Sequence, residues 1–336
     1  MRAAELSAPN SDLELVERDV PSPGPGEILV KMTACGMCNS EVSLVKGEYP
    51  FAHFPTIPGH EVIGTVAELG QGVTWPQAGT QVGAQFLYDS DMTCDYCVRG
   101  DQILCPNKRI TGVVTDGGYA EYAVFKEGFV TPVPEGLDPV AGAPLMCAGL
   151  TAFNGLRQAG VTSGSRVAVL GVGAVGGMAV RFALAMGAQV AVLGRSHRSE
   201  QRAKELGAQR YIATGEQDAV AALKSWGYGA DVLLNTTPST KAATALLGGL
   251  APDGTLSLLG YGPDPLELPS QLMVLNRLHV MASPSGSPHN ARDTLDFALR
   301  HDLMPDVTPI GLDEAPATLA KMVNGEWHNG RAVITF

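Results

Sequence analysis

Three cysteines between residues 90 and 105 are spaced like the ligands of a metal ion. The segment reads SDMTCDYCVRGDQILC, so Cys94, Cys97 and Cys105 follow a C-x2-C-x7-C pattern. Thiolates at such short intervals are typical of structural zinc sites, which are closed by four ligands. The pattern therefore predicts a zinc-binding lobe, and the spacing alone does not name its fourth ligand.

A second set of metal-binding residue types is spread along the first half of the chain. Cys38 lies in ACGMCNSE, His60 in PGHE and Cys147 in PLMCAGLTAF. Two thiolates and one imidazole suit a catalytic zinc, whose fourth position stays open for water or a substrate oxygen. Taken singly, His60 could be a structural histidine and Cys147 a small core residue. Cys35 and Cys38 also form a C-x2-C pair, but we interpret Cys35 as a packing residue because the pair lies in a β-rich region.

The segment RVAVLGVGAVGG contains the glycine spacing of a dinucleotide-binding turn. Gly171, Gly173 and Gly176 stand as G-x-G-x-x-G directly after an apolar strand and before a helix. The first glycine permits the tight turn, the second lets a pyrophosphate approach, and the third lets helix and strand pack closely. A purely structural turn is the alternative. The predicted cofactor contacts here are Gly171, Val172, Gly173, Ala174, Val175 and Gly176.

The next predicted strand, in QVAVLGRSHRS, indicates which cofactor is preferred. Gly194 stands where NAD-binding chains usually carry an acidic residue for the ribose hydroxyls. Arg195, Ser196 and Arg198 follow it and can hold a 2′-phosphate through guanidinium groups and a hydroxyl. The alternative is that both arginines only solvate a surface loop. We predict that NADP(H) is favoured over NAD(H).

Two regions of the chain with different sequence patterns predict the elements that position these residues. Residues 1–145 contain short β-type runs such as EILVKMTA and VIGTVAELG, divided by Gly and Pro. From about residue 150, strands such as RVAVLGVG and DVLLNTT alternate with helical segments, which is typical of a doubly wound parallel sheet. The length of 336 residues also favours two domains. We therefore predict an α/β protein with an additional, mostly β domain.

Composition narrows the classes of partner. A net charge of −11 argues against binding to nucleic acid or anionic lipid, which depends on clustered Lys and Arg. The most apolar region, residues 167–193, is interrupted by Arg181 and several glycines, so we expect no membrane span. Six cysteines and no apparent signal peptide favour metal binding in the cytoplasm over disulfides. The expected partner is a small molecule.

The sequence resembles the zinc-dependent medium-chain alcohol dehydrogenases from end to end. Within them it looks closest to the cinnamyl-alcohol-dehydrogenase-like branch, through PLMCAGLTAF and GRSHR. The family pattern of a cysteine opening C-x-S/T-D/E, then G-H-E, then a distant cysteine falls on Cys38, His60 and Cys147. The resemblance implies a GroES-like catalytic domain, residues 1–145, completed by residues 285–336. It also implies a Rossmann NADP-binding domain, residues 146–284, with the catalytic cleft between the two.

The resemblance also implies a fourth ligand for the zinc lobe. The family lobe reads C-x2-C-x2-C-x7-C, and the residue three positions before Cys94 is Asp91. An aspartate oxygen can ligate zinc at a distance close to that of a nitrogen ligand. A structural zinc held by Asp91, Cys94, Cys97 and Cys105 is therefore implied, and the aspartate is the main departure from the family pattern.

Roles for residues beside the zinc ligands are implied by the same resemblance. Ser40 matches the hydroxyl that passes a proton between the substrate oxygen and solvent. Glu41 matches the acid that orients the zinc-binding imidazole, and Glu61 matches the acid that follows it in sequence. Many relatives carry a histidine as the outlet of the proton relay where this chain has Ser43.

Five further positions are implied to contact cofactor or substrate. Thr151 matches a nicotinamide contact, and Arg331 matches a pyrophosphate contact. Phe86, Tyr49 and Phe51 are expected to line an apolar substrate pocket.

Three functions are compatible with these features. The favoured one is hydride transfer between NADP(H) and a medium-sized, apolar or aromatic aldehyde or primary alcohol, with zinc acting as a Lewis acid on the substrate oxygen. The second is NADPH-dependent reduction of a conjugated C=C or C=N bond, which Ser40 opposes and Ser43 mildly supports. The third, a non-catalytic nucleotide-binding zinc scaffold, is opposed by the complete ligand set. A homodimer or homotetramer is expected.

Overall fold

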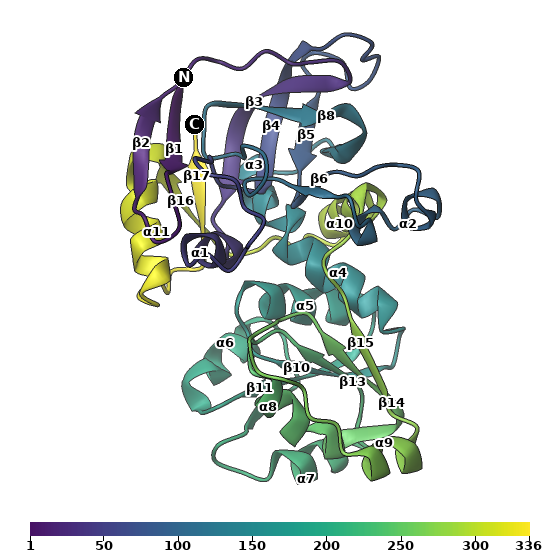
Figure 1. Cartoon of the computed structure of the whole chain (residues 1–336). Coiled ribbons are helices and arrows are strands. Elements are labelled where there is room, and N and C mark those ends of the chain that lie inside the picture. The colour runs from purple at the N-terminus through teal and green to yellow at the C-terminus, as the bar shows by residue number, and fades with distance from the viewer. The chain divides into compact units, whose positions relative to one another are not determined.

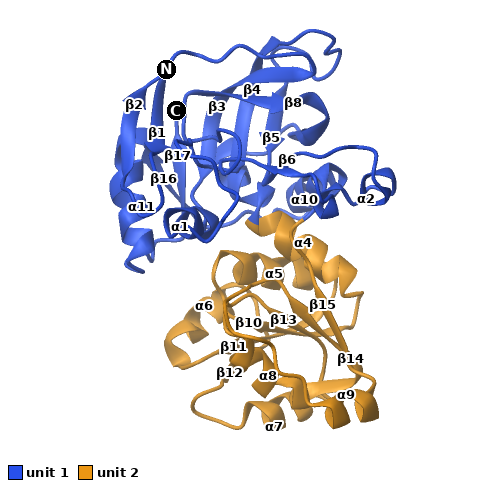
Figure 2. Ribbon diagram, in the orientation of Figure 1, with its two compact units in different colours: residues 1–147, 286–336 blue, residues 148–285 orange.

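The computed structural model describes residues 1–336 and divides the chain into two compact units (Figure 2). Unit 1 contains Met1–Cys147 and Gly286–Phe336, and unit 2 contains Ala148–Ser285. These boundaries lie two residues and one residue after the divisions expected from the sequence, 145/146 and 284/285. The C-terminal segment thus returns to the unit that contains the N-terminus. None of the helices combines the length and the apolar character that crossing a membrane requires.

A mostly antiparallel sheet forms the centre of unit 1 (Figure 1). Its strand order is β16-β17-β3-β4-β5-β9, and β8 also pairs with β3. The last strand, β17, pairs with β3 through Val333 and Gly36, so the C-terminus completes this sheet. The strands of the unit are β1 Arg2–Leu6, β2 Leu13–Glu17, β3 Glu27–Gly36, β4 Glu61–Leu69, β5 Gln81–Ala84, β6 Leu87–Asp89, β7 Arg109–Ile110, β8 Tyr122–Lys126, β9 Val130–Pro132, β16 Val307–Gly311 and β17 Arg331–Thr335.

Short helices connect these strands. Gly and Pro punctuation keeps them short in the first 147 residues, whereas two longer helices follow unit 2 in the chain. The helices of unit 1 are α1 Asn39–Val45, α2 Asp95–Val98, η1 Gln102–Leu104, η2 Glu127–Phe129, α3 Pro139–Gly142, η3 Ala143–Met146, α10 Pro288–Arg300, η6 Leu312–Glu314 and α11 Ala315–Val323.

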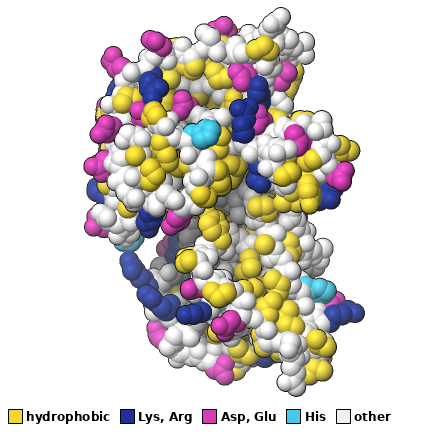
Figure 3. All heavy atoms as spheres, viewed as in Figure 1, with side chains coloured by type: hydrophobic (Ala, Val, Ile, Leu, Met, Phe, Trp, Pro, Cys, Tyr) yellow, Lys and Arg dark blue, Asp and Glu magenta, His cyan; other side chains and the backbone are white.

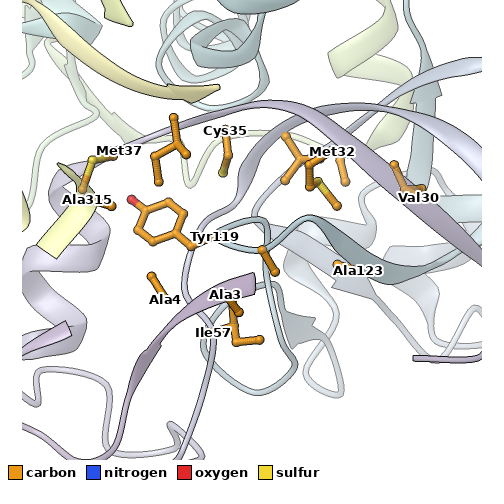
Figure 4. Packing of buried hydrophobic residues seen from close by; sticks show 14 of the residues in the cluster. Ala3, Ala4, Val30, Met32, Cys35, Met37, Ile57, Tyr119, Ala123 and Ala315 are labelled. Carbon is orange, nitrogen blue, oxygen red and sulfur yellow. The ribbon is translucent and has the colours of Figure 1, made fainter. Parts of the chain in front are cut away.

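The core of unit 1 packs around Tyr119, whose side chain is fully buried. Figure 4 shows its ring between Ala4, Cys35 and Met37. Cys35 belongs to this core, and burial raises the pKa of its thiol well above the ordinary value. A buried, protonated thiol is unreactive, which agrees with the interpretation of Cys35 as a packing residue.

Unit 2 is a six-stranded parallel sheet with the order β12-β11-β10-β13-β14-β15. The first strand, β10, lies between β11 and β13, so the order reverses beside it, and ligands of such sheets bind at the carboxyl ends near this point. The doubly wound sheet predicted from the sequence is confirmed. Its elements are α4 Ala148–Gln158, β10 Arg166–Leu170, α5 Ala174–Ala185, β11 Gln189–Gly194, η4 His197–Ser199, α6 Glu200–Glu205, β12 Arg210–Ala213, α7 Ala219–Lys224, β13 Ala230–Asn235, α8 Thr240–Ala245, η5 Leu247–Gly249, β14 Leu250–Leu258, α9 Ser270–Asn276 and β15 His279–Ala282.

Candidate metal centres and cofactor site

Three residues far apart in sequence form the dispersed cluster, which consists of Cys38, His60 and Cys147. Cys38 precedes α1, His60 directly precedes β4, and Cys147 follows η3. The two sulfur atoms are 3.9 Å apart. With an oxygen of Glu61, the ligand atoms of the cluster all lie within 4.8 Å of one another. The fold therefore brings together the residues that the sequence predicted as catalytic zinc ligands.

Glu41 holds two members of the dispersed cluster in place. It is the third residue of α1, where one carboxylate oxygen accepts a hydrogen bond from the Cys38 backbone N–H at 2.6 Å. Its other oxygen lies 2.6 Å from His60 Nδ1. His60 Nε2 is buried and has no hydrogen-bond partner. The side chain that caps the helix thus also orients the imidazole, so that Nε2 is free to bind a metal.

The groups around this cluster shift the pKa values of its members in different directions. Burial is the largest single influence and opposes protonation of the imidazole, but Glu41 and Cys38 together outweigh it and raise the pKa of His60 well above its ordinary value. A hydrogen bond from Cys147 lowers the pKa of Cys38 well below that of a free thiol, with a further contribution from Arg331. The same bond raises the pKa of Cys147. The hydrogen bond thus favours the thiolate form at Cys38, and a bound cation would replace the protons of the other ligands.

Glu61 and Arg331 form a buried ion pair beside the cluster. Arg331 Nη2 lies 3.2 Å from Glu61 Oε1, and Nη1 donates to the Met37 carbonyl at 2.9 Å. Burial raises the pKa of Glu61 to about 8, against the influence of Arg331. A Cβ at Gly36 would lie 2.0 Å from Glu61 Oε2, so only glycine leaves room for this carboxylate. The pyrophosphate contact expected of Arg331 stays a prediction.

The dispersed cluster fits a zinc ion by the chemistry of its donors. It offers two sulfurs and one unpartnered buried nitrogen, with a carboxylate oxygen in reach. These are the donor types that zinc prefers, and a three-ligand set leaves a position open. Sequence reasoning missed Gly59, whose φ of 101° and contact with Tyr119 exclude a side chain directly before His60. The P-G-H-E context was the only signal that could have indicated it.

A row of aromatic rings leads to His60. The Phe86 ring lies 5.3 Å from the imidazole in an edge-on arrangement, and Tyr49 lies 6.5 Å from Phe86. Phe51, which is about half exposed, lies 5.7 Å from Tyr49. The three aromatic residues expected to line a substrate pocket are therefore contiguous and reach the dispersed cluster.

Two predicted hydroxyl residues lie in different surroundings. Ser40 Oγ is 3.7 Å from Cys38 Sγ, within α1. Thr151 is buried in α4 of unit 2. The structure thus places Ser40 beside the dispersed cluster, and the nicotinamide contact of Thr151 stays a prediction.

Four residues of one short segment form the local cluster, which consists of Asp91, Cys94, Cys97 and Cys105. Their ligand atoms also lie within 4.8 Å of one another. Asp91 Oδ1 accepts hydrogen bonds from the N–H groups of Thr93 and Cys94, each at 2.9 Å, and Oδ2 accepts one from Asn107 at 2.9 Å. The backbone bonds, first that from Cys94, lower the pKa of Asp91 well below its ordinary value. The carboxylate is therefore ionised and fixed toward the thiols, as a zinc ligand must be.

One thiol of the local cluster, Cys97, has a strongly raised pKa. Burial raises the pKa of Cys97 to about 11, despite its hydrogen bond to Ser90 Oγ at 3.1 Å. Zinc binding would release the proton of Cys97, because the thiolate is the ligand. The donor set of three sulfurs and one oxygen fits zinc.

The glycines of the G-x-G-x-x-G turn meet three different requirements. Gly171 has a φ of 89°, which side-chain-bearing residues rarely adopt. Gly173 is the N-cap residue of α5, and the space beside it is open, since a Cβ there would meet nothing within 4 Å. At Gly176, a Cβ would lie 2.1 Å from the Gly171 carbonyl oxygen. The geometry provides a turn, an approach for a phosphate and close packing, as the sequence predicted. Of the intervening residues, Val172 lies in the same turn, and Ala174 and Val175 are the first two residues of α5.

The end of β11 presents two unpaired positive charges. Arg195 and Arg198 are exposed, and neither forms an ion pair within the molecule. Gly194 ends the strand, and Ser196 caps the short helix η4. Nearby, a cavity of about 340 Å³ lies at the ends of β10 and β12, lined by Leu170, Thr214, Gln217, Asp218, Ala219, Val220, Ala242, Ala245 and Leu246.

Comparison with known proteins identifies the family. The alcohol dehydrogenase GroES-like domain matches residues 24–135, and the zinc-binding dehydrogenase model matches residues 174–300. An alcohol dehydrogenase of Geobacillus stearothermophilus is 34% identical over 335 residues, covering 99% of this chain and 98% of the relative. A cinnamyl alcohol dehydrogenase structure from Sorghum bicolor is 29% identical with a TM-score of 0.88, covering 99% of this chain and 97% of its own.

A further solved structure is a complex with a cofactor. CAD from Helicobacter pylori, complexed with NADP(H), is 25% identical with a TM-score of 0.87, covering 99% of this chain and 97% of its own. The chain therefore belongs to the zinc-binding medium-chain alcohol dehydrogenase family, in its cinnamyl-alcohol-dehydrogenase-like branch. It is an oxidoreductase of a family that acts on small-molecule alcohols and aldehydes. The resemblance and the GroES-like plus Rossmann fold expected from the sequence are confirmed.

Proposed function

We propose that the protein transfers hydride between NADP(H) and a medium-sized aldehyde or primary alcohol with an apolar or aromatic body. The observation that carries this proposal is the row of Phe51, Tyr49 and Phe86 that ends at the imidazole of His60. A zinc ion held by the dispersed cluster would supply Lewis-acid polarisation of the substrate oxygen, and bound NADPH would supply the hydride. The aromatic row supplies apolar surface for the body of the substrate.

The residues of this chain position the reacting groups and move a proton. Glu41 holds His60 Nε2 toward the metal site and Cys38 at the start of α1. Ser40 Oγ, beside Cys38 Sγ, passes the proton between the substrate oxygen and solvent. Ser43 lies on the same helix in place of the relay histidine of many relatives, so a water molecule completes the path. Arg331, which is paired with Glu61, stabilises the charge of the thiolates from the buried side.

We propose NADP(H) as the preferred cofactor because Arg195 and Arg198 are exposed and unpaired, and Gly194 supplies no carboxylate. Each arginine can form charge-assisted hydrogen bonds with a 2′-phosphate, while the Ser196 hydroxyl adds a neutral one. The glycine-rich turn before α5 receives the pyrophosphate, and the cavity beside Leu170 and Val220 suits the adenine ring.

We also propose a second, structural zinc in the local cluster and a homo-oligomeric state in the cytoplasm. Support for association comes from unit 2, where β15 is an edge strand and α9 has no buried residue. Val274 and Leu275 on α9 are 78% and 74% exposed, and Figure 3 shows hydrophobic side chains gathered over this part of the unit. A second copy would cover this apolar edge, and light scattering of a Val274→Lys, Leu275→Lys variant should show a smaller particle.

One assay tests the proposed reaction. The purified protein is given NADPH and three substrate panels: aromatic and aliphatic aldehydes, conjugated enones, and imines. We expect NADPH oxidation with the aldehydes and alcohol as the product. Reduction of the enone C=C or of the imines alone would contradict the proposal and favour the alternative function, reduction of a conjugated C=C or C=N bond. Nucleotide binding without turnover on any panel would favour the scaffold.

A further inference from the structure

Gly194 is in close contact with a tyrosine from the neighbouring strand. Strands β11 and β12 are parallel, with Val192 opposite Tyr211 and Gly194 opposite Ala213. A Cβ on Gly194 would lie 2.1 Å from Tyr211 Oη and 3.0 Å from its Cζ. Gly194 does not have a positive φ, so its backbone conformation does not require glycine. The tyrosine is therefore what excludes a side chain at this position.

The same tyrosine fixes the segment that follows the strand. Tyr211 Oη donates a hydrogen bond to the Ser196 carbonyl oxygen at 2.6 Å. Two backbone bonds act in parallel with it: Thr214 N–H donates to the Gly194 carbonyl at 2.8 Å, and Gly215 N–H donates to the Arg195 carbonyl at 3.0 Å. The backbone between the two arginines is thus held from one side by residues 211–215.

The acidic groups of this region are engaged elsewhere. His197 Nδ1 lies 2.6 Å from Glu200, and His197 Nε2 lies 3.4 Å from Glu216. The imidazole itself lies near the Tyr211 ring, with 6.2 Å between the centroids. Because both carboxylates pair with His197, neither neutralises Arg195 or Arg198 in this structure.

We propose that Tyr211 is a positioning residue that sets cofactor specificity jointly with Gly194. This inference rests on the proposed preference for NADP(H). The tyrosine hydroxyl holds the Ser196 backbone so that the flanking arginines face a 2′-phosphate. It also fills the space in which the carboxylate of an NAD(H)-binding chain would begin. A switch to NAD(H) therefore requires two changes, a carboxylate at position 194 and a smaller residue at position 211.

A mutant cycle measures this coupling. The set is the unmodified protein, Gly194→Asp, Tyr211→Val and the double variant, each assayed for KM and kcat with NADPH and NADH. We expect Gly194→Asp alone to raise KM for both cofactors, because the new Cβ displaces the tyrosine and the Ser196 segment. We expect the double variant to bind NADH at least about tenfold more tightly than Gly194→Asp does. The matched control combines Gly194→Asp with Tyr228→Val, since Tyr228 is 79% exposed in the same unit.

A milder variant tests the hydrogen bond without a change of volume. Tyr211→Phe should raise the dissociation constant of adenosine 2′,5′-bisphosphate about fivefold, as expected for one lost hydrogen bond, and leave that of AMP unchanged. KM for NADPH should rise by the same factor, while kcat at saturating cofactor stays within about twofold. Calorimetry of the nucleotides needs no turnover, and thermal unfolding checks that the variant is folded.

The outcomes separate this inference from the proposed function. If Gly194→Asp alone gains as much NADH affinity as the double variant, positions 194 and 211 are independent and the inference is wrong. An unchanged affinity of Tyr211→Phe for the bisphosphate would likewise overturn the positioning role. If the unmodified protein prefers NADH, the proposed cofactor preference fails, yet NADH still reports whether the two positions are coupled.

Discussion

The two metal-ligand clusters of unit 1 are built in opposite ways. The dispersed cluster draws its ligands from the start of α1, the start of β4 and the end of η3, so the whole sheet has to form before they meet. The local cluster takes all four ligands from residues 91–105. Its aspartate is held by backbone N–H groups two and three residues away.

The two clusters also differ in the groups that hold their ligands in place. Around the dispersed cluster the holding groups are buried acidic side chains, Glu41 at 2% exposure and Glu61 at 0%. Around the local cluster they are backbone amides and Asn107, which is exposed. Because electrostatic interactions are stronger away from water, substitutions should cost more at the dispersed cluster. The predictions below test this difference, from the largest expected effect to the smallest.

The largest effect is expected for Cys38→Ser. Loss of a thiolate from the dispersed cluster should lower kcat/KM by at least about a thousandfold, because Lewis-acid stabilisation contributes several kcal/mol. Binding of NADPH, followed by fluorescence or calorimetry, should remain, since the glycine-rich turn belongs to unit 2. Cys35→Ala is the matched control, a buried cysteine outside the cluster. Retained turnover in Cys38→Ser would remove Cys38 from the site.

Glu41→Gln should have the next largest effect. Glutamine still accepts from the Cys38 N–H but presents no negative charge to His60 Nδ1. Loss of such an orienting carboxylate typically lowers metal affinity or activity about 10- to 100-fold. Metal content and kcat should fall together, and excess zinc should restore part of the activity. Glu48→Gln, on the exposed surface after α1, is the control and should match the unmodified protein.

The sequence predicted the ligands of both clusters because short motifs carry them. Three thiols at fixed spacing indicate the local cluster directly, and the resemblance to the family pattern implied Asp91, three positions before Cys94. The fold class followed from alternating strands and helices, and the turn glycines from their spacing. Contacts made through strand pairing could not be predicted in this way. Gly36 faces Glu61 only because β3 and β4 pair in that register.

Other long-range contacts were equally inaccessible from the sequence. Tyr211 reaches Gly194 through the register of two parallel strands, and Arg331 reaches Glu61 because the last strand joins the first large sheet. No local pattern marks such residues, because their roles depend on which strands become neighbours. A spacing rule can therefore find ligands, whereas the residues that hold them emerge from the fold.

Asp91→Ala should remove one zinc ion per chain and leave the other in place. Metal analysis of this variant should show the dispersed cluster loaded and kcat within about threefold of the unmodified value, because the local cluster has its own ligands and metal binding adds stability chiefly to the fold. The melting temperature should fall. Asp91→Cys supplies a fourth thiolate and should keep both ions. A fully loaded local cluster in Asp91→Ala would show that another group is the fourth ligand.

The smallest effect is expected for Asn107→Ala, and it sets the scale of the comparison with Glu41→Gln. Both substitutions remove a group that fixes a predicted metal ligand, and at both clusters the contact is short: 2.9 Å from Asn107 Nδ2 to Asp91 Oδ2 and 2.6 Å from Glu41 to His60. Asn107 is exposed and neutral, so water can replace its hydrogen bond, and Asp91 keeps its two backbone donors. Competition with a chromophoric chelator should show zinc affinity of the local cluster lowered by only about threefold, the size of one weak hydrogen bond. Activity should not change. A loss as large as that of Glu41→Gln would contradict the argument, because it would mean that an exposed amide orients its ligand as strongly as a buried carboxylate does.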